Sequence, residues 1–288
     1  MGDISIVGRV QISPPPHLKI RIRCKIAKAA IVNGRHGLMR KYRKPAELKG
    51  WDFSQVRVVE EGPGIDYSKV VESHLERNKT LLDVGTGGGE RLKAFAPKVR
   101  EAIGIDIDRK MIKTAIENLR RSRSQNINLI LCDSEKMPIT GAHIDIVIDR
   151  HAPFEAREVS RVLKLGGTFV TQQVSEGDKR NFKKVFKRGQ SYGEKRDTLK
   201  KRYLRELRES GIHVVKEQTV NTTEYYESMD DVIFLIVNTP IIPNFDFEKE
   251  LDKLEEIEDK FKTQKGIKTN SERFLIVGTK NVEVSVSD

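Results

Sequence analysis

The chain has 288 residues, a third of which are charged, and its formal net charge at pH 7 is +11. This length provides room for one large α/β domain with an appendage. No apolar run approaches the roughly 20 residues that cross a bilayer, which excludes a membrane-spanning protein.

Residues 1–38 form a basic amino-terminal extension with seven basic residues and one acid, and so contribute +6 of the net charge. One hypothesis is that this extension is not native, or is poorly ordered. Residues 8–16 can be back-translated into a sequence that resembles the T-arm of a transfer-RNA gene, which would place the true start at Met39. The alternative is an edge hairpin, because apolar residues and a cysteine alternate with basic residues from Ile20 to Ile26.

The polar residues 39–64 are predicted to be a lead-in to the main domain, which covers residues 65–288. Asp66 can cap a helix through Val71. A regular alternation follows, with strands predicted at 81–84, 102–105, 127–131, 144–148 and 168–172. The helices between them include one that Asp108 caps and one over 155–163 that a glycine pair closes. This alternation predicts a mainly parallel sheet with helices on both faces.

The regular alternation of predicted strands and helices ends after residue 173. The segment at about 178–202 is a basic insertion with a net charge of +8. Two interpretations remain open: it contacts phosphates in a salt-dependent way, or it is a solvated, mobile insertion that acids at 250–259 neutralise. A second basic group consists of Arg120, Arg121 and Arg123.

The last third is predicted to contain helices at 199–209, 225–237 and 247–261 and strands at 212–220 and 274–278. Within it, a lid-like segment covers about 221–265. Its proline-broken loop at 239–246 is apolar, so we expect it to form a lid or a pocket wall.

A glycine-rich turn follows the first predicted parallel strand, in the sequence Asp83-Val84-Gly85-Thr86-Gly87-Gly88-Gly89-Glu90. In an open α/β sheet, ligands bind beyond the carboxyl ends of the strands, and glycines there let the backbone approach a ligand. The alternative is an ordinary strand-to-helix turn that happens to be rich in glycine.

Carboxylates end the next two predicted strands. Asp106 suits the two hydroxyl groups of a ribose, and Asp133, followed by Ser134, can accept a hydrogen bond from an exocyclic amine such as adenine N6. Each acid could instead cap a helix. Asp108 is the better cap of its helix, so Asp106 is expected to stay free.

These motifs, together with Arg161-Val162-Leu163-Lys164-Leu165-Gly166-Gly167, resemble those of class I S-adenosylmethionine-dependent methyltransferases, in particular the ubiquinone and menaquinone biosynthesis subgroup. The resemblance covers about residues 65–175. It implies a Rossmann-like, seven-stranded, mainly parallel sheet with helices on both faces and an antiparallel last hairpin. The sequence departs from the family pattern at two positions. Leu165 stands where proline is usual, and Cys132 precedes the adenine acid and is assigned no catalytic task.

The resemblance implies that S-adenosyl-L-methionine is the cofactor. The turn would line its methionine end, Asp106 would hold the ribose and Asp133 the adenine. The expected cofactor site comprises Asp83, Gly85, Thr86, Gly87, Gly89, Asp106, Ile107, Asp133, Ser134 and Arg150. A dinucleotide-binding dehydrogenase is disfavoured, because the last glycine of its G-x-G-x-x-G fingerprint is Glu90 here.

The acceptor is expected to face the residues after the fourth predicted strand, where His151 is the candidate base. Its alternative role is contact with the cofactor or the surface. Arg150 could contact the cofactor or an anionic acceptor, and Tyr67 could close the pocket or belong to the core.

The expected function is methylation of a small, partly apolar molecule. RNA methylation is the first alternative, and a non-catalytic cofactor-binding protein is the second. The two cysteines lack the spacing of a metal site or a disulfide framework, and no signal peptide is evident. We therefore expect a cytoplasmic enzyme with no metal.

Overall fold

The computed structural model describes residues 41–42, 53–120 and 125–281. The hypotheses on residues 1–38, most of the lead-in before residue 53, and Arg121 and Arg123 lie outside these ranges. Within the described ranges, no helix is long and apolar enough to cross a membrane.

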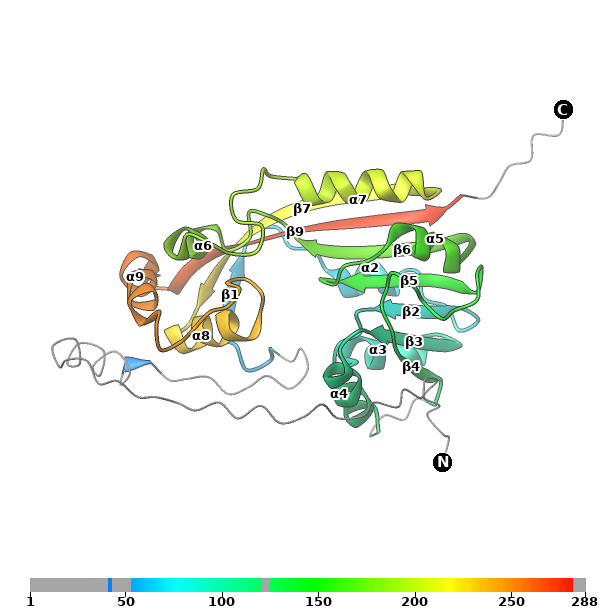
Figure 1. The fold of residues 1–288 in the computed structure, drawn as a ribbon, viewed down its shortest axis with the longest axis horizontal. Coiled ribbons are helices and arrows are strands. Elements are labelled where there is room, and N and C mark those ends of the chain that lie inside the picture. Colours follow the sequence, from blue (N-terminus) through cyan, green and yellow to red (C-terminus); the bar gives the residue numbers. More distant parts are fainter. Residues whose placement is uncertain (1–40, 43–52, 121–124, 282–288) are drawn as a thin grey trace, which may run out of the picture.

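The described residues build one sheet with helices on its faces (Figure 1). Its strand order is β1-β7-β9-β6-β5-β2-β3-β4, and the short β8 pairs with β9. The strands are β1 (Val58–Glu61), β2 (Thr80–Val84), β3 (Glu101–Asp106), β4 (Ile127–Leu131), β5 (Ile144–Arg150), β6 (Leu163–Val174), β7 (Ile212–Tyr226), β8 (Lys262–Thr263) and β9 (Gly266–Lys280). The helices are α2 (Tyr67–Glu72), α3 (Glu90–Phe95), the 3-10 helix η1 (Ala96–Lys98), α4 (Arg109–Leu119), α5 (Ala156–Val162), α6 (Arg180–Phe186), α7 (Thr198–Glu209), α8 (Met229–Asn238) and α9 (Leu251–Phe261).

The five strands β4, β3, β2, β5 and β6 are parallel, as the alternation of strands and helices predicts. All residues of β2 are buried, because helices cover both faces of the sheet at its centre. Two apolar clusters, one on each face, hold these helices against the sheet. The parallel arrangement brings the carboxyl ends of the five strands to one edge.

The antiparallel part of the sheet is larger than predicted. The sheet has nine strands instead of seven, and the two additional strands are β1, from the predicted lead-in, and β8. β7 and β9 pair over almost their whole lengths, well beyond the predicted strands 212–220 and 274–278. The sequence underestimates them because polar residues dominate their extensions, where pairing with the neighbouring strand decides the conformation.

Several predicted helix boundaries shift for local reasons. α8 begins at Met229 rather than Tyr225, because Ser228 and Asp231 form a capping box that starts the helix there. α5 ends at Val162 and β6 begins at once, before the glycine pair that was expected to close the helix. α9 begins at Leu251, four residues later than expected.

The basic insertion forms α6 and α7 with a connecting segment. A third apolar cluster joins α6, α8 and α9 to the far half of β7 and β9, where they form a second half of the molecule (Figure 1). Lys179 and Lys183 are only 1% and 3% exposed, so the interpretation of a solvated insertion is wrong for these two residues.

Candidate active site

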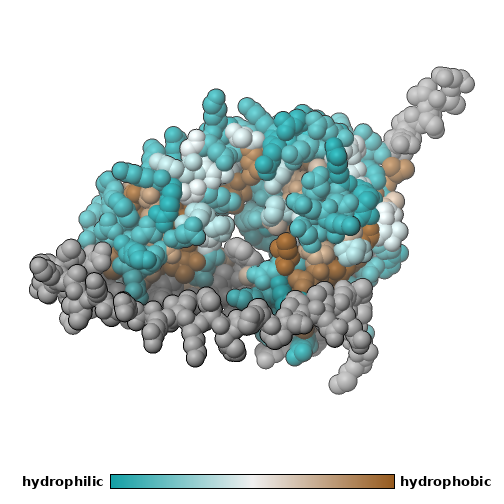
Figure 2. All heavy atoms as spheres, in the orientation of Figure 1, coloured by the Kyte–Doolittle hydropathy of each residue, from teal (hydrophilic) through white to brown (hydrophobic). Residues whose placement is uncertain are grey.

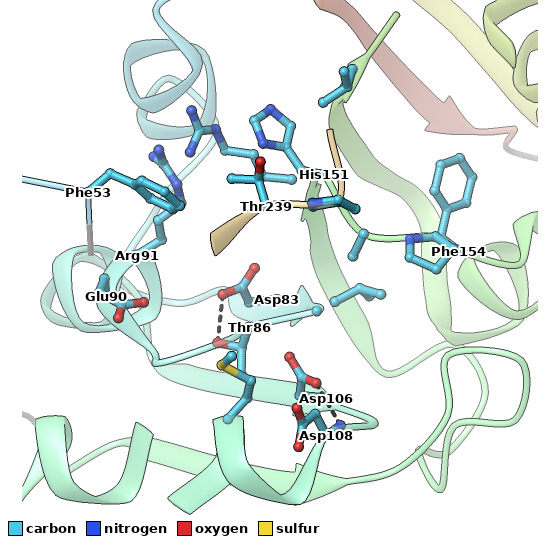
Figure 3. Close-up of a pocket in the computed structure, with 18 of the residues that line it drawn as sticks. Phe53, Asp83, Thr86, Glu90, Arg91, Asp106, Asp108, His151, Phe154 and Thr239 are labelled. Atoms are coloured by element: carbon cyan, nitrogen blue, oxygen red, sulfur yellow. Dashed lines mark hydrogen bonds between the residues drawn. The ribbon is translucent and has the colours of Figure 1, made fainter. Parts of the chain in front are cut away.

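A cavity of about 1030 Å³ lies at the carboxyl ends of β2, β3, β4 and β5. Its opposite wall comes from β1, β7, β9 and the segment after α8, and the space-filling view shows the molecule hollowed between its two halves (Figure 2). Carboxylates surround the lower part of this cavity in the close-up view, and Arg91, His151 and Thr239 lie across from them (Figure 3). Both halves of the fold are therefore needed to enclose the site.

The glycine-rich turn after β2 adopts the backbone geometry that only glycine tolerates well. Gly85, Gly87 and Gly89 have φ angles of 67°, 56° and 76°. A Cβ atom on Gly85 would lie 2.3 Å from the Cβ of Ala152, so this residue also allows β2 and β5 to approach closely at their ends. Of this turn, Gly85 and Thr86 line the cavity, whereas a Cβ atom on Gly89 would face Ala115 and Leu119 of α4.

Asp83 lies at the end of β2 and lines the cavity although only 4% of it is exposed. The Thr86 hydroxyl donates a hydrogen bond of 2.8 Å to its Oδ2. Burial raises the pKa of Asp83 to about 7 despite this bond. Its carboxyl group is therefore poised to ionise when a cation enters the cavity.

Asp106 and Ile107 line the cavity at the tip of β3. As expected, Asp106 does not cap α4, but it accepts hydrogen bonds from the backbone amides of Gly87 (2.9 Å) and Asp108 (2.8 Å). These bonds fix the carboxylate against the glycine turn, and each oxygen retains a lone pair for a ligand. Asp108 caps α4 through the amide of Lys110, as expected.

The tip of β4 also meets the cavity. Asp133 accepts a hydrogen bond of 3.0 Å from the amide of Glu135, and the Ser134 hydroxyl donates to the carbonyl of Pro153 at 3.2 Å. Cys132 lies beside them, and burial raises its pKa to about 11, so the thiol is neutral at physiological pH.

Arg150, the last residue of β5, and His151, which follows it, line the cavity. His151 has a φ angle of 64°, which is uncommon for a residue with a side chain and often marks a functional position. Desolvation, together with Arg150 and Arg273, holds the pKa of His151 well below its usual range. The imidazole is therefore neutral at physiological pH and able to accept a proton.

Asp149, near the end of β5, belongs to the segment expected to face the acceptor, but the sequence interpretation assigned it no role. Its Oδ1 accepts hydrogen bonds from Thr171 and Gln173, whereas its buried Oδ2 has no partner among the described residues. Burial raises the pKa of Asp149 well above its usual range. Tyr67 donates to the Asp149 carbonyl and belongs to the core, which decides between its two expected roles.

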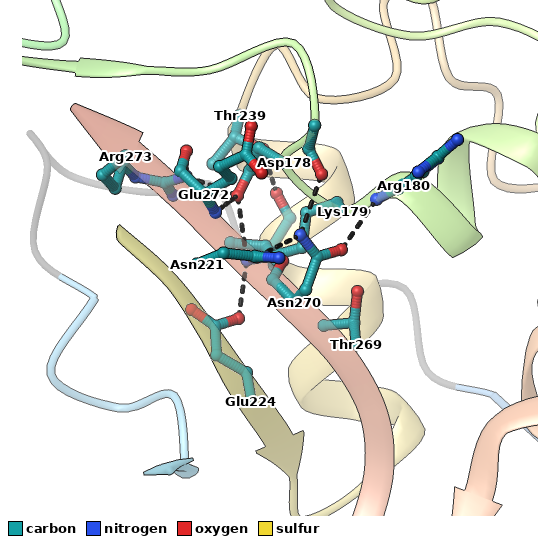
Figure 4. A network of polar contacts seen from close by, with 12 residues as sticks. Asp178, Lys179, Arg180, Asn221, Glu224, Thr239, Thr269, Asn270, Glu272 and Arg273 are labelled. Atoms are coloured by element: carbon teal, nitrogen blue, oxygen red, sulfur yellow. Dashed lines mark hydrogen bonds and ion pairs between the residues drawn. The ribbon is translucent and has the colours of Figure 1, made fainter. Parts of the chain in front are cut away.

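The opposite wall carries a buried ionic cluster, which we define as Asp178, Lys179, Glu224 and Arg273 (Figure 4). Lys179 Nζ lies 2.6 Å from Glu224 Oε2, and Arg273 pairs with Asp178. Sequence reasoning missed this cluster because it joins residues from the basic insertion, β7 and β9. The positive φ angle of Lys179 (48°) is visible only in the structure.

The apolar loop after α8 supplies part of the same wall. Of the loop expected to form a lid or a pocket wall, Thr239, Pro240 and Ile241 line the cavity. The expected neutralisation of the basic insertion is confirmed at one point, where Arg188 pairs with Glu250 at 2.6 Å.

Comparison with known proteins identifies the domain. Residues 75–211 match the family described as a methyltransferase domain. An uncharacterised methyltransferase of Bacillus subtilis (strain 168), YcgJ, is 32% identical over 97 residues, which cover 31% of this chain and 38% of that protein. The malonyl-[acyl-carrier protein] O-methyltransferase of Marinomonas sp. (strain MWYL1) is 24% identical over 188 residues, which cover 59% of this chain and 68% of that protein.

A solved structure agrees with this result. A protein assigned as a methyltransferase (BH2331) from Bacillus halodurans C-125 is 25% identical and has a TM-score of 0.59, over 76% of this chain and all of that one. The sheet, the glycine turn and these matches define the fold of class I methyltransferases, which confirms the expected fold class. The chain carries a class I methyltransferase domain, at residues 75–211.

Proposed function

We propose that the protein transfers a methyl group from S-adenosyl-L-methionine to a small, partly apolar molecule. The observation that carries this proposal is the juxtaposition of the bare glycine turn with Asp106 and Asp133 at one end of the large cavity. Three neighbouring strand tips there offer close backbone approach, a fixed carboxylate and a second carboxylate, which matches the three parts of an adenosyl sulfonium amino acid.

The residues present fit this cofactor. Asp83, Gly85, Thr86, Gly87 and Gly89 would surround its methionine end, where the Asp83 carboxyl group can neutralise an ammonium group. Asp106 with Ile107 would hold the ribose, and Asp133 with Ser134 the adenine. A carboxylate that accepts hydrogen bonds from both ribose hydroxyls contributes about 1.5–3 kcal/mol per bond.

The bound cofactor would supply a methyl group already activated by the sulfonium. The protein then has to align the acceptor with the S–CH3 bond and exclude water. His151, held neutral by its surroundings, can take a proton from the acceptor atom if that atom must lose one. No covalent intermediate with the protein is required.

The residues that line the proposed acceptor side of the cavity favour a small molecule as the methyl acceptor. Phe53, Leu235 and Ile241 give it apolar surface, and the ionic cluster gives it polar groups. Two of the cations that could have favoured RNA, Lys179 and Lys183, are buried, and Arg188 is paired with an acid. One relative is named for methylating a malonyl group on a carrier protein, which is also not a nucleic acid.

The direct test of the proposed cofactor site is Asp106→Ala. We expect it to weaken binding of S-adenosylmethionine by about 100-fold or more, because two charge-assisted hydrogen bonds are lost. Isothermal titration calorimetry measures the affinity, and circular dichroism checks that the chain is folded. Unchanged affinity in the folded variant would refute the assignment.

A further inference from the structure

A small polar recess of about 160 Å³ adjoins the large cavity. Five residues line both spaces, namely Glu60, Arg150, His151, Glu224 and Arg273. The recess has room for a few water molecules or for one small polar group such as a carboxylate or a phosphate. Because the five shared residues connect it with the large cavity, it suits one end of a molecule whose remainder occupies that cavity.

Arg150 presents an unused hydrogen-bonding edge in this region. Its Nε donates to Gln172 Oε1 at 2.8 Å, and its guanidinium lies 6.0 Å from the centre of the Tyr67 ring. Among the described residues, its two terminal nitrogens make no hydrogen bond and no carboxylate lies within 4.0 Å of them. A guanidinium oriented in this way is ready to bind a carboxylate or phosphate with two parallel hydrogen bonds.

The charges around Arg150 are not balanced locally. Arg273, the other arginine of the recess, is paired with Asp178, but Arg150 has no such partner in the described chain. Burial and the neighbouring Arg91 lower the pKa of Arg150 to about 10, and Tyr67 and Glu60 oppose this shift only in part. An anion beside it would remove this penalty.

The proposed cofactor does not supply that anion. S-adenosylmethionine carries a sulfonium and an ammonium group against one carboxylate, so its binding adds positive charge to the cavity. Arg91, in the first turn of α3, also lines the cavity and is available to pair with the cofactor carboxylate. The recess then remains available to the acceptor.

We propose that this recess binds an anionic group, a carboxylate or a phosphate, of the methyl acceptor, and that Arg150 makes a bidentate contact with it. The substrate class is thus a small anionic molecule with an apolar part. This inference rests on the proposed function. It assigns Arg150 to the acceptor rather than to the cofactor, the two roles that its position in the sequence leaves open.

The two acids of the recess differ in their effect. Glu224 is held by Lys179 and by the Tyr226 hydroxyl, so its charge is already compensated. Glu60 is exposed on β1 and has no ion pair among the described residues, so it would repel a bound anion. Glu60→Gln is therefore expected to strengthen anion binding, a gain that misfolding would not produce.

The experiment uses the full chain saturated with S-adenosylhomocysteine, whose own carboxylate occupies the methionine end. Malonate and inorganic phosphate are titrated at constant ionic strength, with chloride as the reference salt, and binding is followed by calorimetry. We expect Arg150→Met to weaken binding of both anions about tenfold or more and Glu60→Gln to tighten it, while the affinity for S-adenosylhomocysteine changes less than about threefold. Arg150→Lys keeps the positive charge but lacks the two parallel N–H donors of the guanidinium. Its affinity for the anions should therefore lie between those of the wild type and Arg150→Met.

Arg202→Met is the matched control, because Arg202 also lies over a tyrosine ring (Tyr203, 5.2 Å) but on the outside of α7. It should leave anion binding unchanged. The inference is overturned if the anions do not bind, if they compete with S-adenosylhomocysteine, or if Arg150→Met has no effect. If S-adenosylhomocysteine itself does not bind to the wild type, the proposed function fails instead.

Discussion

At the scale of single residues, Asp83 connects the stability of the protein with its ligand. Its carboxyl group is buried, accepts one hydrogen bond from Thr86 and titrates near neutrality. Between about pH 4 and pH 7, Asp83 of the ligand-free folded protein is protonated, whereas in the unfolded chain it has already lost this proton. Folding stability therefore falls as the pH rises from about 4 to about 7.

Asp83→Asn should remove this pH dependence. Relative to wild type, the ligand-free variant should gain up to about 4 kcal/mol of unfolding free energy between about pH 4 and pH 8, because the amide keeps the Thr86 contact without a charge. Urea unfolding at both pH values measures the difference. The same variant should bind S-adenosylmethionine more weakly at pH 8. A stability difference that does not vary with pH would contradict the pKa assignment.

His151 is the second residue whose role can be tested alone. If the acceptor atom loses a proton during transfer, His151→Asn should lower the transfer rate about 100- to 10,000-fold and leave cofactor affinity unchanged. Because its pKa is depressed, the wild-type imidazole stays neutral as the pH falls to about 6.5, so the rate should not fall from its protonation over that interval. Transfer of a labelled methyl group into fractionated cell extract measures this rate. An equal loss of cofactor affinity would instead indicate a structural role.

At the scale of elements, the turn between β2 and α3 brings two strands and a helix to one point. Gly85 has a positive φ angle and faces Ala152 across the end of β5, and Gly89 caps α3. Asp106 ties the same turn to β3 through the amide of Gly87. The proposed cofactor site and the fold therefore depend on the same turn.

Gly85→Ala should destabilise the fold by about 2–4 kcal/mol, because the added Cβ is strained by the backbone and collides with Ala152. It should also weaken cofactor binding, since the turn must move. Gly64→Ala is the matched control, because a Cβ there meets no atom within 4 Å. Denaturant unfolding and calorimetry compare the two. Equal stability of both variants would show that the turn tolerates a side chain.

At the scale of the whole molecule, the long antiparallel strands β7 and β9 carry the half that forms the cavity wall opposite the parallel strand tips. The ionic cluster lies where these strands meet the basic insertion, and Lys179 and Glu224 are both nearly inaccessible. Buried pairs of this kind cost desolvation energy, so breaking one partner leaves an uncompensated charge.

Lys179→Met should lower the unfolding free energy by about 3–5 kcal/mol, and the double variant Lys179→Met with Glu224→Gln should recover part of this loss. Lys201→Met, at an exposed position of α7, should have little effect. Unfolding in urea at low and high salt provides the comparison. A destabilisation that disappears in high salt would mean that Lys179 is solvated rather than buried.

The sequence by itself determined the parallel half of the fold and the residues expected at its cofactor end. Hydrophobic runs, helix caps such as Asp108 and the glycine turn are local signals. Each of them specifies the conformation of residues that are close to it in the sequence. The positive φ angles in the turn and the pocket wall after α8 followed from such signals. For the same reason, the residues of the proposed cofactor site could be named from the sequence.

Only the tertiary structure decided the antiparallel extension, the buried ionic cluster and the recess beside Arg150. Each of these joins segments that are distant in the chain, as when Lys179 meets Glu224 or β1 pairs with β7. A lysine in a basic segment looks solvated in the sequence, because burial and ion pairing depend on which residues the fold brings opposite it. The cavity wall opposite the parallel strand tips is built mainly from such long-range contacts, and local sequence signals therefore do not specify it.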